Sequence, residues 1–416
     1  MTLATGKNGG MERSEPLRSR PRLLYLCQQN PWRLAGGGLI RNYWISRALT
    51  ERFDVDLVTA DDDVAAPEAY ARRFRSIRGF ARPRGVTARA LRAVAALRPG
   101  ASLLTAGTVT QGLRAHIAAT AITERYGAVM FDLNMLEAIP PNVPQIYHAH
   151  NCETALLRRR AAIEKFPARL AVAADAIRLA RIESRVLRDA SLVVACSQAD
   201  VADLTSLQST AAELPVVPNG VDVAGYASVH AAKPTGRVAL ITGSYDWRPN
   251  QLGLDWFLRA VLPEMHALAN GRTFTIRVAG RMSDDYARKL KAFPSVVAVP
   301  NPPQMMGELE GASIVVAPIL ASSGTRLRIL EAWAAGRPVV TTPEGAFGLP
   351  FTDGVDLVVR SASDPRGFAR ALWRVLDDPA ERERLAGAGY ERSHMYDWPA
   401  LGEGLVAALE RALPTA

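Results

Sequence analysis

The sequence predicts an α/β protein built from two doubly wound units in tandem, which face each other across a cleft. Three observations lead to this architecture. Short aliphatic or β-branched runs alternate with longer helical patterns, which is typical of a parallel sheet covered by helices on both faces. The alternation stops in a polar stretch of small residues at 222–237 and then restarts. At 416 residues, the chain is long enough for two or three domains.

The first unit is expected at residues 21–225, after a disordered polar tail at 1–20. Its strands are expected at 22–27, 55–58, 128–131, 146–149 and 192–195, where aliphatic and β-branched residues cluster. Helices are expected at 39–51 and 110–125 and over most of 153–188. Residues 216–217 should close this half.

The second unit is expected at residues 236–397. Its strands are expected at 238–242, 274–279, 296–299, 314–318, 339–341 and 357–359. Helices are expected at 252–268, 326–335, 365–376, 380–390 and, beyond this unit, 401–413. In open sheets of this kind, ligands bind beyond the carboxyl ends of the strands, so the cleft between the two units is the expected site.

Composition excludes several classes of protein. Hydrophobic residues make up 48% and charged residues 22% of the chain, which is a globular rather than a disordered or fibrous composition. No apolar run reaches the roughly 18 residues that a membrane span needs, and the N-terminus lacks a secretory signal. The three cysteines are far apart, which excludes a disulfide framework and a cysteine-based zinc site and indicates a reducing, cytoplasmic compartment.

The net charge of +9 is unevenly distributed. Residues 1–230 contain 29 Lys and Arg against 21 Asp and Glu, whereas residues 231–416 contain 21 against 20. Residues 71–100 contain nine arginines and no acid. A basic surface indicates nucleic acid, an anionic membrane or anionic small molecules. The alternative is a genomic preference for arginine, since the chain has 45 Arg and five Lys.

The most informative stretch is residues 317–342, APILASSGTRLRILEAWAAGRPVVTT. A strand leads through a loop of small residues into a helix, with Ser323 or Thr325 as N-cap. The free amides at the start of a helix bind anions. The helix dipole disfavours cations in the first turn, so an anionic ligand would explain why Arg326 and Arg328 stand there. Glu331 follows one turn later and has the chemistry to bind both hydroxyls of a ribose. The alternative is an ion pair between Arg328 and Glu331 on a packing helix.

This stretch resembles the donor-site motif of family 4 retaining glycosyltransferases (group 1), which have the GT-B fold of two Rossmann-like domains. That motif has two glutamates eight positions apart, and Glu331 matches the second, which binds the donor ribose in the family. Ser323 stands where the first would be. The resemblance implies that the donor is held by this segment, namely by Ser323, Gly324, Thr325, Arg326, Arg328 and Glu331.

Two further motifs of the first half match the family in chain order. Gly36, Gly37 and Gly38 follow the first strand, where the family has a glycine-rich loop near the donor phosphates, and Gly37 and Gly38 are the expected donor contacts. Two histidines follow in YHAHNCE at residues 147–153, and His150 matches the family's strand-end histidine beside the reacting sugar. His148 is interpreted as a supporting histidine. A metal held by the two histidines is the alternative, with no third ligand evident in the sequence.

The loop GSYDWRPN at residues 243–250 resembles a variant of the family's donor-phosphate loop. Gly243, Arg248 and Asn250 are therefore expected donor contacts. The lysine of the more widespread variant is absent, so Arg248, Arg281 and Arg326 are expected to share the phosphate. The segment 398–416, beginning at Trp398, resembles the C-terminal helix that crosses back to the first domain in this fold.

The resemblance implies transfer of a sugar from a nucleoside-diphosphate sugar to a glycan or lipid-linked acceptor, with retention of configuration. His150 and Glu331 are the expected catalytic residues, and neither a metal nor another cofactor is expected, because no Asp-x-Asp metal motif is evident around a strand end. The basic half of the chain is interpreted as facing an anionic membrane, on the inner face of the plasma membrane, or a lipid-diphosphate acceptor. The alternatives are an epimerase that isomerises the nucleotide sugar at C2 without an acceptor, and a nucleic-acid-binding protein. The sequence shows no aromatic platform or helix-turn-helix pattern for the latter, and no nucleic acid is expected.

Overall fold

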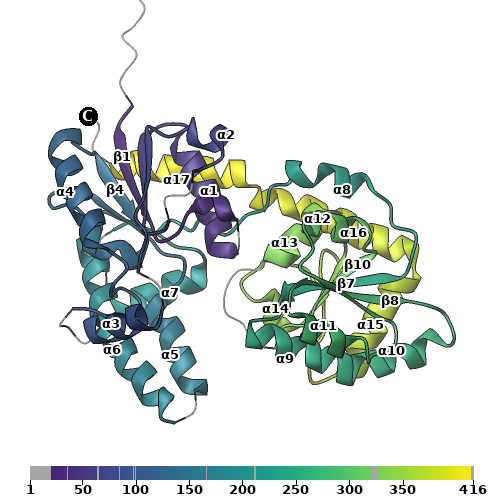
Figure 1. Cartoon of the computed structure of the whole chain (residues 1–416). Coiled ribbons are helices and arrows are strands. Elements are labelled where there is room, and N and C mark those ends of the chain that lie inside the picture. Colours follow the sequence, from purple (N-terminus) through teal and green to yellow (C-terminus); the bar gives the residue numbers. More distant parts are fainter. Residues whose placement is uncertain are drawn as a thin grey trace, which may run out of the picture.

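The computed structural model describes residues 20–34, 36–62, 65–83, 85–96, 98, 100–164, 166–209, 212–320 and 327–413. Two six-stranded sheets form the protein, one in each half of the chain (Figure 1). Every strand pair in both sheets is parallel. The two doubly wound α/β units predicted from the sequence are therefore confirmed.

The first sheet has the strand order β3-β2-β1-β4-β5-β6. Its strands are β1 (Arg22–Cys27), β2 (Asp54–Thr59), β3 (Ser76–Gly79), β4 (Ala128–Phe131), β5 (Gln145–His148) and β6 (Leu192–Val194). The α-helices are α1 (Gly37–Leu49), α2 (Glu68–Ala71), α3 (Val86–Ala95), α4 (Gln111–Glu124), α5 (Glu153–Ile163), α6 (Ala168–Asp189) and α7 (Gln198–Leu207), and short 3₁₀ helices lie at Pro31–Arg33 and Leu133–Ala138.

The second sheet has the order β12-β11-β10-β7-β8-β9, which repeats the winding of the first. Its strands are β7 (Val238–Ser244), β8 (Thr275–Arg281), β9 (Val296–Pro300), β10 (Ile314–Ala317), β11 (Val339–Thr341) and β12 (Val358–Val359). The helices are α9 (Arg248–Trp256), continuous through a π-helical turn at Phe257–Val261 with α10 (Leu262–Ala269), then α11 (Asp284–Leu290), α12 (Met305–Glu310), α13 (Leu327–Ala334), α14 (Pro343–Ala346), α15 (Pro365–Asp377) and α16 (Pro379–Ser393).

Each sheet is buried on both faces, which explains why its strands are almost uniformly apolar. Along β1, Leu23 and Tyr25 face one core with α1, whereas Leu24 and Leu26 face the opposite core. The first of these cores also includes Leu405 from the last helix, α17 (Trp398–Ala412). Helix α17 thus packs on the first unit, and its Trp398 stacks on Trp44 at 6.3 Å between ring centroids.

The chain crosses between the units twice, and the two crossings are hydrogen-bonded to each other. The amide of Val221 donates to the carbonyl of Tyr396, and the amide of Trp398 donates to the carbonyl of Val221. Gly220 fits here because a Cβ at its position would lie 2.6 Å from the Tyr396 carbonyl oxygen. After a 3₁₀ turn at His394–Tyr396, the chain enters α17 and returns to the first unit (Figure 1).

The stretch at 222–237, where the alternation of strands and helices stops, joins the two units and is partly helical. It contains a 3₁₀ turn at Ala224–Tyr226 and the short helix α8 (Ala227–Ala231). Buried Arg337 fastens α8 to the second unit, because its guanidinium donates to the carbonyls of Val229 and Ala232. Alanine is the best helix former, so a run of small residues is compatible with a short helix as well as with a linker.

Two stretches are organised in more detail than the sequence predicted. The helical region expected at 153–188 is a hairpin of α5 and α6, broken at Pro167, which cannot continue a helix from α5. The arginine-rich stretch 71–100 contains strand β3 and helix α3, which the sequence pattern did not reveal. The disordered tail expected at 1–20 lies outside the described residues except for Arg20, which donates to the carbonyl of Thr50. Among the helices that the structure describes, none is both long enough and apolar enough to cross a membrane.

Candidate active site

A pocket of about 470 Å³ opens at the carboxyl ends of β1, β4 and β5. This is where the strand order of the first sheet reverses, between β1 and β4, and ligands bind at such switch points. The start of α1 forms one wall and the chain after β5 forms another. The lining includes Gly36, Gly37, Gly38, Asn42, Asp132, His148, His150, Asn151, Glu153 and Asn219.

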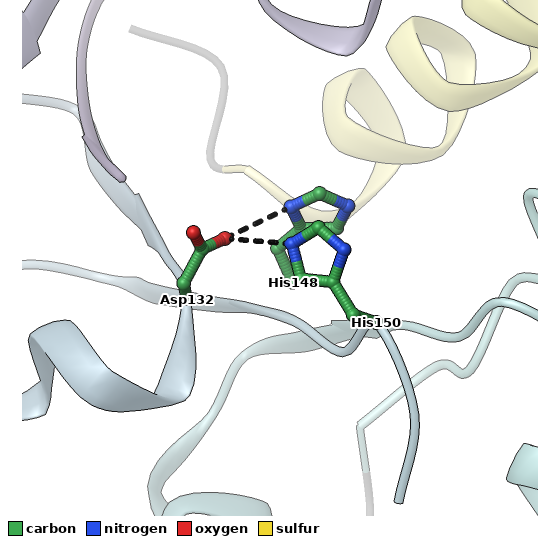
Figure 2. A group of neighbouring side chains, drawn as sticks. All are labelled: Asp132, His148 and His150. Atoms are coloured by element: carbon green, nitrogen blue, oxygen red, sulfur yellow. Dashed lines mark hydrogen bonds and ion pairs between the residues drawn. The ribbon is translucent and has the colours of Figure 1, made fainter. Parts of the chain in front are cut away.

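Asp132 is the centre of the polar network in this pocket. Its Oδ1 lies 3.1 Å from His150 Nε2 and 3.3 Å from His148 Nδ1, so one carboxylate oxygen faces both rings (Figure 2). Its Oδ2 accepts from Asn42 Nδ2 at 3.1 Å and from the amide of Gln28 at 3.3 Å. Burial alone would raise the pKa of Asp132, but the charge on His150 and the hydrogen bonds from both histidines lower that pKa well below its usual range. The carboxyl group is therefore ionised.

His148 is fully buried and its tautomer follows from its neighbours. The Nε of Arg41 always carries a hydrogen, and it donates to His148 Nε2 at 2.8 Å. The hydrogen of the neutral ring must then be on Nδ1, which lies near Asp132 and 3.2 Å from the Tyr25 hydroxyl. Burial, followed by the charge on His150, lowers the pKa of His148 to about 3. His148 is a neutral ring that orients Asp132.

His150 is the histidine that the pocket exposes. Because Asp132 is ionised, the hydrogen of their shared bond is on His150 Nε2, which leaves Nδ1 as the acceptor of the neutral ring. The edge that carries Nδ1 faces the first turn of α1, where a Cβ at Gly38 would lie 3.8 Å from this nitrogen. A hydroxyl bound in the pocket can donate to His150, and the free amides of α1 can bind an anionic oxygen beside it.

Asp132, His148 and His150 also have the spacing of metal ligands, since their ligand atoms lie within 4.8 Å of one another. Sequence reasoning found no third ligand for the two histidines, and the structure supplies one. The donor set does not fit a metal, however. Arg41 occupies the lone pair of His148 Nε2, so His148 Nδ1 carries a hydrogen and has no lone pair to offer.

A buried carboxylate fixes the opposite wall of the pocket. Glu183 of α6 accepts from the Tyr147 hydroxyl at 2.9 Å and from the amides of Glu153 and Thr154 at 3.1 and 2.9 Å. It thereby caps the start of α5, where free amides favour a negative charge. Burial, and then the nearby charge of Glu183, raise the pKa of Glu153 to about 7. Near neutral pH, Glu153 can therefore act as donor or acceptor toward a ligand.

The second unit carries its predicted residues at the carboxyl end of β7. Asn250 donates to the carbonyl of Ser244 at 2.8 Å and accepts from Arg328 Nη2 at 3.1 Å. A Cβ at Gly243 would lie 3.3 Å from Asn250 Nδ2 and 3.5 Å from the Arg328 guanidinium, so these three residues meet. Burial lowers the pKa of Arg328, although the nearby charge of Glu331 opposes this shift.

Glu331 lies one turn along α13 from Arg328, but they do not form the ion pair considered above. The hydroxyl of Tyr226, from the segment that joins the two units, lies close to the carboxylate of Glu331. Burial raises the pKa of Glu331 to about 7, although the charge of Arg328 and the nearby Tyr226 hydroxyl oppose the shift. A phenol group thus lies beside the carboxylate that would accept from a sugar hydroxyl.

The remaining predicted donor contacts are either peripheral or not described. Arg281 forms an ion pair with Asp246 at 2.9 Å and a hydrogen bond with Ser244. Arg248 begins α9 and donates to Gln251. Both side chains are exposed. Ser323, Gly324, Thr325 and Arg326 lie outside the described residues.

Sequence reasoning missed several residues of the candidate site, among them Asp132, Arg41 and Tyr226. Asp132 comes directly after β4, and a carboxylate at the carboxyl end of a central strand was a signal that could have found it. Arg41 lies 107 residues from His148 in the middle of a helix, and Tyr226 lies in the segment interpreted as a linker. Neither of these two has a signal in a single sequence.

Two family models match the chain. The model described as Glycosyltransferase Family 4 matches residues 35–224, which include the pocket of the first unit. The model described as Glycosyl transferases group 1 matches residues 236–378, which include the cluster of the second unit. Together they cover well over half of the chain.

Curated relatives match over part of their length. A glycogen synthase of Mycobacterium tuberculosis is 30% identical over 225 residues, which are 52% of this chain and 53% of that protein. A phosphatidyl-myo-inositol mannosyltransferase of Mycolicibacterium smegmatis is 26% identical over 218 residues, which are 51% of this chain and 55% of that protein. The chain thus spans about half the length of these relatives.

Solved structures match over nearly the whole chain. Sucrose-phosphate synthase from Thermosynechococcus elongatus has a TM-score of 0.65 at 16% identity, and the match covers 94% of this chain and 98% of that one. HepE of Anabaena, in complex with UDP and glucose, has a TM-score of 0.61 at 18% identity, covering 94% of this chain and 100% of that one. At this identity the likeness shows the fold, which is the predicted GT-B fold.

Proposed function

We propose, because the chain belongs to the family 4 (group 1) glycosyltransferases, that it transfers a sugar from a nucleoside-diphosphate sugar to a glycan or lipid-linked acceptor with retention of configuration. The product would be a cell-surface polysaccharide or glycoconjugate. The observation that carries the proposal is the pocket at the switch point of the first sheet, where His150 presents an acceptor nitrogen oriented by ionised Asp132. Helices α9, α13 and α14 of the second unit lie on the side that faces the first unit (Figure 1).

The donor binds to the second unit in this proposal. Half-buried Arg328 forms no ion pair with a carboxylate within 4 Å among the described residues, so it is available to the diphosphate, with Asn250 and Gly243 beside it. Glu331, which lies beside the Tyr226 hydroxyl, would accept from the hydroxyls of the ribose. A fixed guanidinium that neutralises the leaving diphosphate is the electrostatic stabilisation that commonly contributes most to catalysis. HepE, a structural neighbour, binds UDP, so uridine nucleotides are the first candidates.

His150 binds the transferred sugar in the first unit. Its Nδ1 accepts from a sugar hydroxyl, while the Nε2 hydrogen bond to Asp132 keeps the ring in this orientation. The amides at the start of α1 face the same space and can bind phosphate oxygen. No nucleophile pair suited to a double displacement is apparent at this site, so attack of the acceptor on the face of the departing diphosphate is the step that accounts for retention.

The test is nucleotide-sugar binding followed by product analysis. A thermal-shift panel of UDP, GDP and ADP sugars should identify one donor, because a ligand at 100 times its Kd stabilises a protein by about 2.7 kcal/mol. Glu331→Ala should abolish this shift and transfer, whereas Glu310→Ala, an exposed carboxylate of the same unit, should change neither. Activity should persist in EDTA.

Three results would contradict the proposal. Unchanged turnover in Glu331→Ala would exclude the assigned donor site. An isomerised sugar formed from the donor without any acceptor would show an epimerase. Inversion at the anomeric carbon of the product would exclude front-face transfer.

A further inference from the structure

The hairpin of α5 and α6 carries an apolar face that nothing in the described chain covers. Phe166, in the turn between the helices, is 79% exposed, Leu170 is 62% exposed and Ile177 is 59% exposed. In Figure 1 the hairpin projects from the lower end of the first unit, opposite α17. Exposed apolar side chains are common singly, but a group of large ones on one face marks an interaction surface.

The spacing on α6 places these residues in one stripe with basic residues. Leu170, Ala174 and Ile177 follow one another at intervals of four and three residues, which is the period of a helix face. The same stripe continues at Arg181, Arg185 and Arg188, all of which are exposed. The opposite side of α6 packs into the core of the first unit through Leu179, Ile182 and Val186. The outer face is thus apolar toward the hairpin turn and basic toward the other end.

The basic residues of this stripe have no internal partner. No ion pair or side-chain hydrogen bond joins Arg181, Arg185 or Arg188 to any other residue of the described chain. The two buried acids of α6 face inward instead. Asp175 accepts from the amide of Leu103, and Glu183 caps α5. The third acid of α6, Asp189, is exposed beside Arg188, so the outer face has a net positive charge beside its apolar side chains.

We propose that the hairpin face of Phe166, Leu170, Ile177, Arg181, Arg185 and Arg188 docks on an anionic lipid bilayer. An apolar stripe with adjoining arginines is the chemistry of a helix that lies in a membrane interface, where apolar side chains enter the acyl boundary and arginines bind anionic headgroups. A second copy packed against the same face would bring arginines against arginines, because α6 has one exposed acid, Asp189, against Arg181, Arg185 and Arg188. The charge of the face selects a negatively charged surface.

The position of the hairpin gives this docking a consequence for the acceptor. Helix α5 begins at Glu153, which lines the pocket, and its 11 residues span about 16 Å to the hairpin turn. A bilayer at the turn would therefore lie within reach of a pocket that opens near His150. This part of the inference rests on the proposed function and favours a lipid-linked acceptor, whereas the docking itself does not depend on catalysis.

The experiment is vesicle co-sedimentation of the full chain without donor or acceptor. We expect binding to vesicles of phosphatidylcholine with one third phosphatidylglycerol, little binding to phosphatidylcholine alone, and loss of binding as salt rises. Leu170→Ser with Ile177→Ser should reduce binding at least tenfold. Arg181→Glu with Arg185→Glu should do the same, since each basic residue near such a surface contributes about fivefold.

Matched controls lie elsewhere on the protein. Ile122→Ser with Val297→Ser changes two exposed apolar residues, and Arg259→Glu with Arg370→Glu changes two exposed arginines of the second unit. Both pairs should bind vesicles as the unaltered protein does. Circular dichroism and donor binding should be unchanged in the hairpin variants, which separates a lost surface from a lost fold.

Three outcomes would overturn the docking. The hairpin variants could bind anionic vesicles like the controls, or the unaltered protein could bind neutral and anionic vesicles equally. The hairpin variants could also convert a dimer into a monomer in analytical ultracentrifugation, which would assign the face to a second copy of the chain. If vesicle binding holds while no nucleotide sugar binds, the proposed function fails and the docking stands.

Discussion

Replacing Asp132 with asparagine tests the network of the pocket at almost constant volume. The carboxylate accepts three hydrogen bonds, from His150, Asn42 and the amide of Gln28, and its Oδ1 lies 3.3 Å from His148 Nδ1. An asparagine side chain has one acceptor oxygen and one NH2 group. If the asparagine oxygen stays between the two histidines, its NH2 group faces the side-chain NH2 of Asn42 and the amide of Gln28. Both of these are donors, so neither would have an acceptor. Transfer should be lost because His150 is no longer held in place.

The magnitude follows from those two lost bonds. Each stranded buried donor costs about 1–3 kcal/mol, giving roughly 2–6 kcal/mol. The variant no longer has to desolvate a charge, which offsets part of this loss, so we expect a free energy of unfolding lower by about 3 kcal/mol. The sign of the pH dependence is also determined. The low pKa of folded Asp132 stabilises the fold above pH 4, and this contribution is lost as the pH falls further.

The assay is guanidinium chloride unfolding of Asp132→Asn and of the unaltered protein at several pH values. Asp203→Asn is the matched control, because its carboxylate pairs with exposed Arg159 on the surface, where such pairs contribute at most about 1 kcal/mol. The difference between Asp132→Asn and the unaltered protein should be largest near pH 7 and shrink below pH 4. A loss under 1 kcal/mol at pH 7, or a loss that is the same at every pH, would refute the network as described.

Three other substitutions have defined outcomes. Gly220→Ala should lower the free energy of unfolding by about 1–3 kcal/mol, because the new methyl group meets the backbone of the second crossing. Gly404→Ala, which places its methyl group in open space on α17, should raise the free energy of unfolding by up to about 1 kcal/mol. Equal effects of the two substitutions in denaturant unfolding would contradict this. Arg337→Met should destabilise the second unit by about 3 kcal/mol and expose α8 to proteolysis, since several backbone carbonyls lose their donor; an unchanged cleavage pattern would count against it. The pKa of folded Glu331 is raised to about 7, so the free energy of unfolding falls as the pH rises from about 4.5 through 7. Glu331→Gln should therefore be more stable than the unaltered protein by up to about 3 kcal/mol at pH 8 but by little at pH 5. A difference that is the same at every pH would exclude the raised pKa.

The fold was predictable from the sequence because it depends on periodicity. Strands buried on both faces are uniformly apolar, and the order of strands and helices along the chain determines a doubly wound sheet. Motifs singled out His150 and Glu331, and the structure places His150 in the pocket of the first unit. Arg41 could not be located, because a helix pattern does not tell which polar residue of α1 will be buried against a strand far along the chain. The helical linker was missed for a different reason, since small residues are typical of both loops and short helices.

The fastening of α8 by Arg337 determines how the two units can move. Because Arg337 holds α8 against the second unit, the chain passes between the units around Gly220 and around Asp397. These two crossings are hydrogen-bonded to each other through Val221, so they form one junction rather than two separate ones. Relative motion of the two units is therefore expected to be a bending or twisting at this junction. Opening would tilt the second sheet away from the pocket without separating the units.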